Sequence, residues 1–170
     1  LEMSFVDAED VMTVNEGFIK ELFQKVLGVE VQTPFLRMPW KESMERFGND
    51  KPDMRFGFEL KNVSDLVKDC GFGVFSGAIA NGGAVRGINV NGYADKFSRK
   101  EIDSLGEYVK GFGAKGLAWI KVNKDGVQSP IAKFFKEEEM AALLQRMEAK
   151  ENDLLLFVAD KESVVFAALA

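Results

Sequence analysis

The charged residues around Pro52 are the first group in this sequence whose types and spacing could do chemistry. Two carboxylates and two cations lie within six consecutive positions, on Asp50, Lys51, Asp53 and Arg55. Proline disfavours helical geometry in the residue before it, so the stretch is predicted to be an exposed turn. Its composition alone favours a charged surface turn, and the alternative is a rigid loop that contacts a charged ligand or a partner.

The stretch Gly111–Gly116 matches the pattern G-x-G-x-x-G. In dinucleotide-binding proteins this pattern follows a strand and opens a helix, whose N-terminus meets the pyrophosphate. Here the order is reversed, because a helical pattern ends at Phe112 and a strand pattern begins at Leu117. We therefore interpret the glycines as a helix end and a tight turn.

Catalytic side chains and metal ligands are scarce. The carboxylates of Glu137–Glu139 open a predicted helix, where consecutive residues point in different directions and acidic groups suit the helix dipole. The sequence has no His and a single Cys, Cys70, which we interpret as a buried structural thiol. These features exclude His-dependent nucleophilic catalysis and the usual zinc sites. We predict no catalytic residue, metal site or cofactor within this chain.

Charge and compartment follow from the composition. The 170 residues include 22 basic and 27 acidic side chains, a net charge of −5, whereas a free-standing RNA-binding module normally has a basic excess. Any contact with RNA must therefore be local or depend on a partner surface. The lone cysteine fits a reducing compartment, and no apolar run is long enough to cross a membrane. We predict a cytoplasmic protein without a membrane partner.

The predicted elements fall into two groups, with a boundary near Gly57, where the sequence changes from a charged turn to a compact unit. Before it, a helix over residues 8–27 begins after the N-cap Asp7 and ends at Gly28, and a second short helix runs from Trp40 to Gly48. Between the two helices, Val29–Phe35 is expected to be extended. After Gly57, a capping box at residues 98–101 opens a helix. A short helix capped by Ser64 is expected to run through Leu66 and Val67. The other predicted elements are strands at 72–80 and 84–91 joined by an Asn-Gly-Gly hairpin turn, a strand at 117–122, a helix at 137–149, a strand at 154–159 and a helix at 163–169.

Several motifs, taken together and in order, resemble the bacterial-type aspartyl-tRNA synthetases. They are Leu1-Glu2-Met3-Ser4-Phe5, Glu9-Asp10-Val11-Met12, Thr33-Pro34-Phe35-Leu36-Arg37-Met38, Glu42-Ser43-Met44-Glu45-Arg46-Phe47-Gly48 and Asp50-Lys51-Pro52-Asp53-Met54-Arg55-Phe56-Gly57. The remainder resembles the GAD domain inserted into those enzymes, in which Gly116-Leu117-Ala118-Trp119 and Ser129-Pro130-Ile131-Ala132-Lys133-Phe134 are characteristic.

The resemblance implies an architecture. Residues 1–57 would be part of a class II catalytic domain, forming a helical remnant, and residues 58–170 the GAD insertion. The expected fold is α+β, a two-layer sandwich whose four-stranded antiparallel or mixed sheet is covered by helices on one face. The apolar face of the 8–27 helix is expected to dock on the GAD core or on a second copy of the chain.

The resemblance also implies a function. The complete ligase would activate aspartate with ATP and Mg²⁺ and transfer it to tRNA, as a homodimer. Its catalytic arginine motifs would lie before and after this segment, so the segment is expected to be inactive alone and to need the remainder of the synthetase as a partner. Glu2 would lie nearest the active site, and Asp50, Lys51, Asp53 and Arg55 are candidates for an interface or tRNA-side loop. The alternative is a GAD binding module of a tRNA-dependent amidotransferase subunit.

Overall fold

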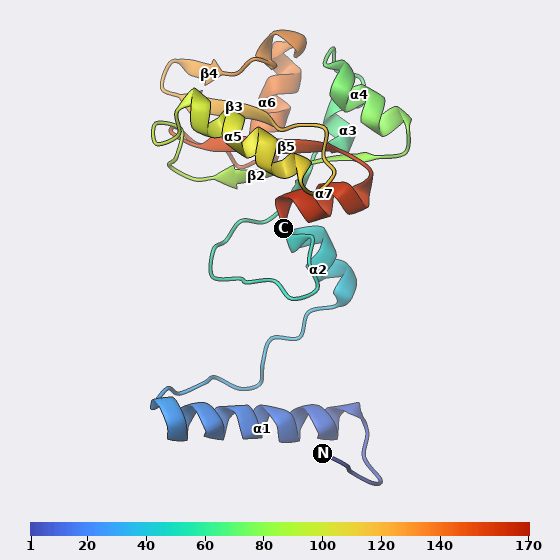
Figure 1. Ribbon diagram of the computed structural model, residues 1–170, viewed down its shortest axis with the longest axis vertical. Helices are drawn as coiled ribbons and strands as arrows, with labels where there is room; N and C mark the ends of the chain where they lie inside the picture. The colour runs from blue at the N-terminus through green and yellow to red at the C-terminus, as the bar shows by residue number, and fades with distance from the viewer. The chain divides into compact units, whose positions relative to one another are not determined.

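The computed structural model describes residues 1–170, which form two compact units, Leu1–Met38 and Pro39–Ala170 (Figure 1). The first unit is built on helix α1 (Ala8–Leu27), whose ends agree with the prediction. The Asp7 carboxylate accepts hydrogen bonds from the backbone N–H groups of Glu9 and Asp10, at 2.8 and 3.1 Å, and Gly28 ends the helix with φ 67°. Local side-chain chemistry therefore determines both ends of α1.

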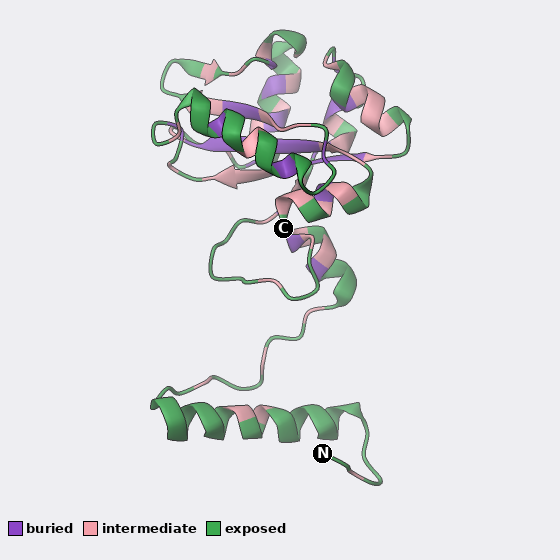
Figure 2. Cartoon of the chain, viewed as in Figure 1, coloured by how far each residue is buried: buried purple, intermediate pink, exposed green.

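The segment after α1 folds back on it through polar contacts. The Arg37 guanidinium pairs with the carboxylates of Glu9 and Glu16, and the Phe35 N–H donates to Glu16 at 3.2 Å. This segment contains no strand. No residue of α1 is buried (Figure 2). Phe18, on its apolar face, is 61% exposed. The apolar face thus has no cover within the first unit.

The second unit is organised around one antiparallel sheet with the strand order β1-β2-β5-β3-β4. Five strands are present where four were predicted: three of the predicted strands form, the one expected at residues 72–80 does not, and two short strands occur at residues 61–62 and 126–128. The central strand, β5, pairs with both β2 and β3. The strands are β1 (Lys61–Asn62), β2 (Ala84–Val90), β3 (Ala118–Asn123), β4 (Gly126–Gln128) and β5 (Leu154–Asp160).

Helices cover both faces of this sheet, so the predicted two-layer arrangement with helices on one face is wrong (Figure 1). Leu155 and Phe157 pack toward one helical layer, and their neighbours Leu154, Leu156 and Val158 pack toward the other. The sequence of β5 is a continuous apolar run because the strand is buried on both faces. One layer contains α3 (Ser64–Val67), α4 (Gly73–Ala80) and α6 (Glu137–Arg146), and the other α5 (Arg99–Lys110) and α7 (Glu162–Leu169).

Helix α4 corrects the strand predicted over residues 72–80. A short apolar run does not distinguish a strand from a buried helix, and here Phe75 is fully buried while Ile79, one turn later, packs on the same core. The Asn-Gly-Gly sequence ends the helix and does not form a hairpin. Gly82 has φ 76°, and the N–H groups of Gly82 and Gly83 donate to the carbonyls of Ile79 and Ala78, both at 2.9 Å.

Helix α2 (Trp40–Phe47) belongs to the second compact unit. It packs against α7, and the Leu60 N–H donates to the Arg46 carbonyl at 2.7 Å. The compact unit therefore begins at Pro39, whereas the division at residue 57 concerns which residues come from which domain of a larger protein and stays a prediction. A 3₁₀ turn (Ala132–Phe134) completes the unit, and no helix combines the length and apolar composition that a membrane span needs.

Candidate functional site

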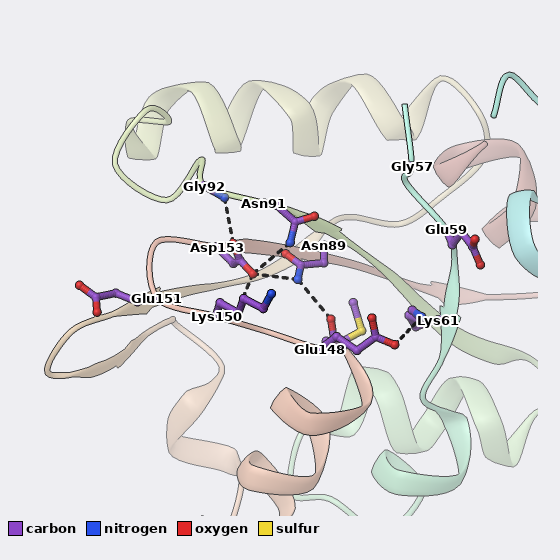
Figure 3. A pocket seen from close by; sticks show the side chains of 11 residues that line it. Gly57, Glu59, Lys61, Asn89, Asn91, Gly92, Glu148, Lys150, Glu151 and Asp153 are labelled. Atoms are coloured by element: carbon purple, nitrogen blue, oxygen red, sulfur yellow. Dashed lines mark hydrogen bonds and ion pairs between the residues drawn. The ribbon is translucent and has the colours of Figure 1, made fainter. Parts of the chain in front are cut away.

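A polar pocket of about 550 Å³ opens where the ends of β1 and β2 meet the turn that leads into β5 (Figure 3). Asp153 lies at its centre and is only 3% exposed. The pocket is also lined by Gly57, Glu59, Lys61, Asn89, Asn91, Gly92, Met147, Glu148, Lys150 and Glu151.

The Asp153 carboxylate is held by four donors from two loops and a strand. It accepts from the backbone N–H groups of Gly92 and Lys150, at 2.8 and 2.9 Å, and from the side-chain amides of Asn89 and Asn91, at 2.9 and 3.2 Å. Burial by itself would raise the pKa of Asp153, but these hydrogen bonds hold the pKa below its ordinary value. The group therefore stays ionised and connects the two loops, and it is not suited to act as a general acid.

Two further pairs involve charged residues of the pocket. Lys61 Nζ lies 3.0 Å from Glu148, and the Glu59 carboxylate receives Arg46 in a two-pronged contact at 2.7 and 3.1 Å. The buried Asn89 Oδ1 has no hydrogen-bond partner. Sequence reasoning missed this site, although Asn91-Gly92 is a turn signal.

The charged loop predicted from the sequence brings two of its four residues together. The Asp53 carboxylate pairs with the Arg55 guanidinium and also accepts from the Arg55 backbone N–H at 3.0 Å, and both contacts lower the pKa of Asp53 to about 2. Asp50 and Lys51 are exposed. The loop forms one wall of an apolar cleft of about 330 Å³, whose other residues include Phe47, Phe56, Phe58, Ile88 and Leu169.

The remaining candidates belong to other elements of the chain. Glu2 is an exposed residue of the other compact unit. Gly111–Gly116 lies between the end of α5 and the start of β3, and Gly113 has φ 90°. This agrees with the interpretation of the glycines as a helix end and a turn. Glu139 uses its carboxylate to accept from the backbone N–H of Lys136 at the start of α6. Cys70 is buried, which raises the pKa of its thiol.

One buried charge lies outside every sequence motif. Arg86, on β2, is 1% exposed. Its guanidinium lies 2.8 Å from the Glu45 carboxylate of α2 and 2.9 Å from the Glu162 carboxylate of α7, and its carbon is 4.9 Å from the centre of the Phe166 ring. Burial opposes the charge, yet the hydrogen bonds to both carboxylates raise the pKa of Arg86. The sequence contains no local signal for this contact, because its partners lie far along the chain.

The fold is an α+β domain whose buried polar groups connect its elements. No group of three or more His, Cys, Asp or Glu side chains is arranged to hold a metal ion. The sequence model of the GAD domain matches residues 75–169. The chain belongs to the GAD domain family.

Similarity extends beyond the matched domain to the whole chain. The aspartate–tRNA ligase of Clostridium perfringens strain ATCC 13124 is 59% identical over 169 residues, which cover 99% of this chain and 28% of the relative. The aspartate–tRNA(Asp/Asn) ligase of Lachnoclostridium phytofermentans is 56% identical over 170 residues, with the same coverage. These relatives confirm the resemblance noted from the sequence motifs. The chain spans about 28% of the length of the relatives it matches.

Proposed function

We propose that this chain acts as a segment of an aspartate–tRNA ligase, in which it supplies the GAD domain and the polypeptide leading into it. The single observation that carries the proposal is the 59% identity over 99% of the chain, because that stretch includes residues 1–57 as well as the GAD domain. An amidotransferase subunit is less well supported, since it should lack the sequence that precedes the GAD domain.

The proposed reaction belongs to the complete ligase, which would use ATP and Mg²⁺ to activate aspartate before transferring it to tRNA. Within this chain, no group of three or more His, Cys, Asp or Glu side chains is arranged to hold a metal ion. We assign this chain an accessory role in positioning tRNA or supporting the catalytic domain, and we assign ATP and Mg²⁺ binding to the remainder of the ligase. In this proposal the Asp50–Arg55 loop is a candidate interface or tRNA-side loop, and Glu2 lies near the active site. The complete ligase is cytoplasmic and acts as a homodimer.

A graft tests the proposal. The matching 169-residue segment of the Clostridium perfringens ligase would be replaced by this chain, and aminoacylation of tRNA with radiolabelled aspartate would be measured. We expect activity within about tenfold of the unaltered enzyme, a loss of no more than about 1.4 kcal/mol in transition-state stabilisation. A folded graft that fails to aminoacylate tRNA would contradict the proposal.

Two further experiments separate the role of the GAD domain from that of the catalytic domain. The same ligase lacking the equivalent of residues 58–170 should keep aspartate-dependent exchange of ATP with pyrophosphate but lose efficiency with tRNA. This chain alone should show no such exchange. Adenylate formation by the isolated chain would overturn the accessory role.

A further inference from the structure

The contacts of Arg86 join the GAD domain to a helix outside it. Helix α2 lies before the residues 75–169 that match the GAD family, whereas Arg86 lies within them. Besides the Glu45 carboxylate, the Arg86 guanidinium reaches the Glu45 backbone carbonyl at 3.3 Å. The contact therefore engages the helix backbone as well as a flexible side chain.

The exposed fractions of the three side chains show which of them depends on the contact. Arg86 is 1% exposed, whereas the side chains of Glu45 and Glu162 are 49% and 54% exposed. Either carboxylate could be solvated without Arg86, but the buried guanidinium depends on these two carboxylates, and without them its charge would be unpaired in the interior. The attachment of α2 is thus built into the core of the GAD domain.

A buried arginine fixes the orientation of α2 relative to the GAD domain. An apolar side chain would fill the same space, often with no loss of stability, whereas a planar guanidinium fixes the positions of the carboxylates that it contacts. The neighbouring Arg46 makes a separate contact, because its guanidinium pairs with Glu59, which lies beyond the Asp50–Arg55 loop. Helix α2 and Glu59 therefore flank that loop in the sequence.

We propose that Arg86 is a positioning residue that fastens α2 and the Asp50–Arg55 loop to the GAD domain, so that the GAD domain and this preceding segment act as one rigid body in the ligase. The inference rests on the proposed function for its place in the reaction. The attachment itself depends only on this chain.

Hydrogen exchange on the full chain tests the attachment. Glu45→Gln removes a charge from Arg86 at the surface, and Glu42→Gln is the matched control, since Glu42 is on the same helix but pairs with Arg46. We expect Glu45→Gln and Arg86→Met to raise exchange in α2 about tenfold or more, with α6 unchanged. Arg86→Lys should lie between wild type and Arg86→Met. An equal rise in both helices, or none in α2, would overturn the proposal.

The grafted ligase tests the consequence for the reaction. We expect Arg86→Met and Glu45→Gln to lower kcat/KM for tRNA about tenfold while changing ATP–pyrophosphate exchange less than about twofold, and Glu42→Gln to change neither. An equal fall in both activities would indicate a purely structural role and overturn the positioning role. An inactive wild-type graft would count against the proposed function instead, and exchange in α2 would still decide the attachment.

Discussion

At the scale of single residues, Asp153 shows how one buried carboxylate organises several loops. Replacing Asp153 with Asn keeps the shape but removes the charge and leaves one acceptor oxygen for four donors. We expect the free energy of unfolding to fall by about 2–4 kcal/mol, since hydrogen bonds to charged groups are stronger than neutral ones and buried donors would lose their partner. Urea unfolding would measure the change. Asp125→Asn, at an exposed turn, is the control and should have almost no effect.

The same carboxylate makes stability depend on pH. Its pKa is lowered in the folded protein, so its contribution is fully present above the pKa of the unfolded chain and is lost as pH falls through the folded value. The difference in unfolding free energy between wild type and Asp153→Asn should therefore be constant above about pH 5 and shrink in more acidic solution. A difference that grows on acidification would contradict this assignment.

Residues whose partners are close in sequence could be predicted, and those with distant partners could not. The caps at Asp7 and Ser98 were predicted because each accepts from backbone N–H groups within three positions. Arg86 reaches partners 41 and 76 positions away, and Asp153 reaches Asn89 64 positions away. No periodicity or local motif encodes such pairs, so the polar pocket and the buried arginine required the fold.

At the scale of elements, the sequence identifies the strands β2, β3 and β5 and the helices α1, α2, α5, α6 and α7. It misassigns α4, because Gly73–Ala80 is almost uniformly apolar and has no period to read. It also misses the short strands β1 and β4, which owe their existence to pairing with longer neighbours. The number of layers was missed because β5 alternates between two apolar faces.

The pairing of β2 with β5 depends on a missing side chain. A Cβ at Gly87 would lie 2.5 Å from a ring carbon of Phe157 and 2.8 Å from the Leu156 carbonyl oxygen. Gly87→Ala should therefore destabilise the protein by about 1–3 kcal/mol through overpacking. Gly77→Ala is the matched control, because Gly77 is in α4 with open space around it, and should stabilise by about 0.4–1 kcal/mol. Thermal unfolding of both variants would check these opposite signs.

At the scale of the whole molecule, the first unit presents the apolar side of α1 without cover of its own. Phe18 and Leu22 are 61% and 40% exposed. We expect this surface to be covered in solution by a second copy of the chain or by the GAD core, because apolar patches of this kind mark interaction sites. Sedimentation and hydrogen exchange separate the two: a second copy gives α1 protection that rises with protein concentration, and intrachain cover does not.

A matched pair of variants tests which surface is responsible. Phe18→Glu should remove the protection of α1, whereas Gln24→Glu introduces the same charge elsewhere on the same helix and should not. A monomer in which α1 exchanges rapidly at every concentration would contradict the expectation for either form of cover.

The central place of β5 has a consequence for the order of events during synthesis. It is the last strand in the chain, yet it is the only one that joins β2 to β3. While it is still within the ribosome, the earlier strands can form only separate fragments with open edges, which are prone to pair with other chains. The sheet must therefore close late, across large sequence separations that slow folding. Nascent chains released before Leu154 should aggregate, and chaperones that protect open strand edges would find their substrate there.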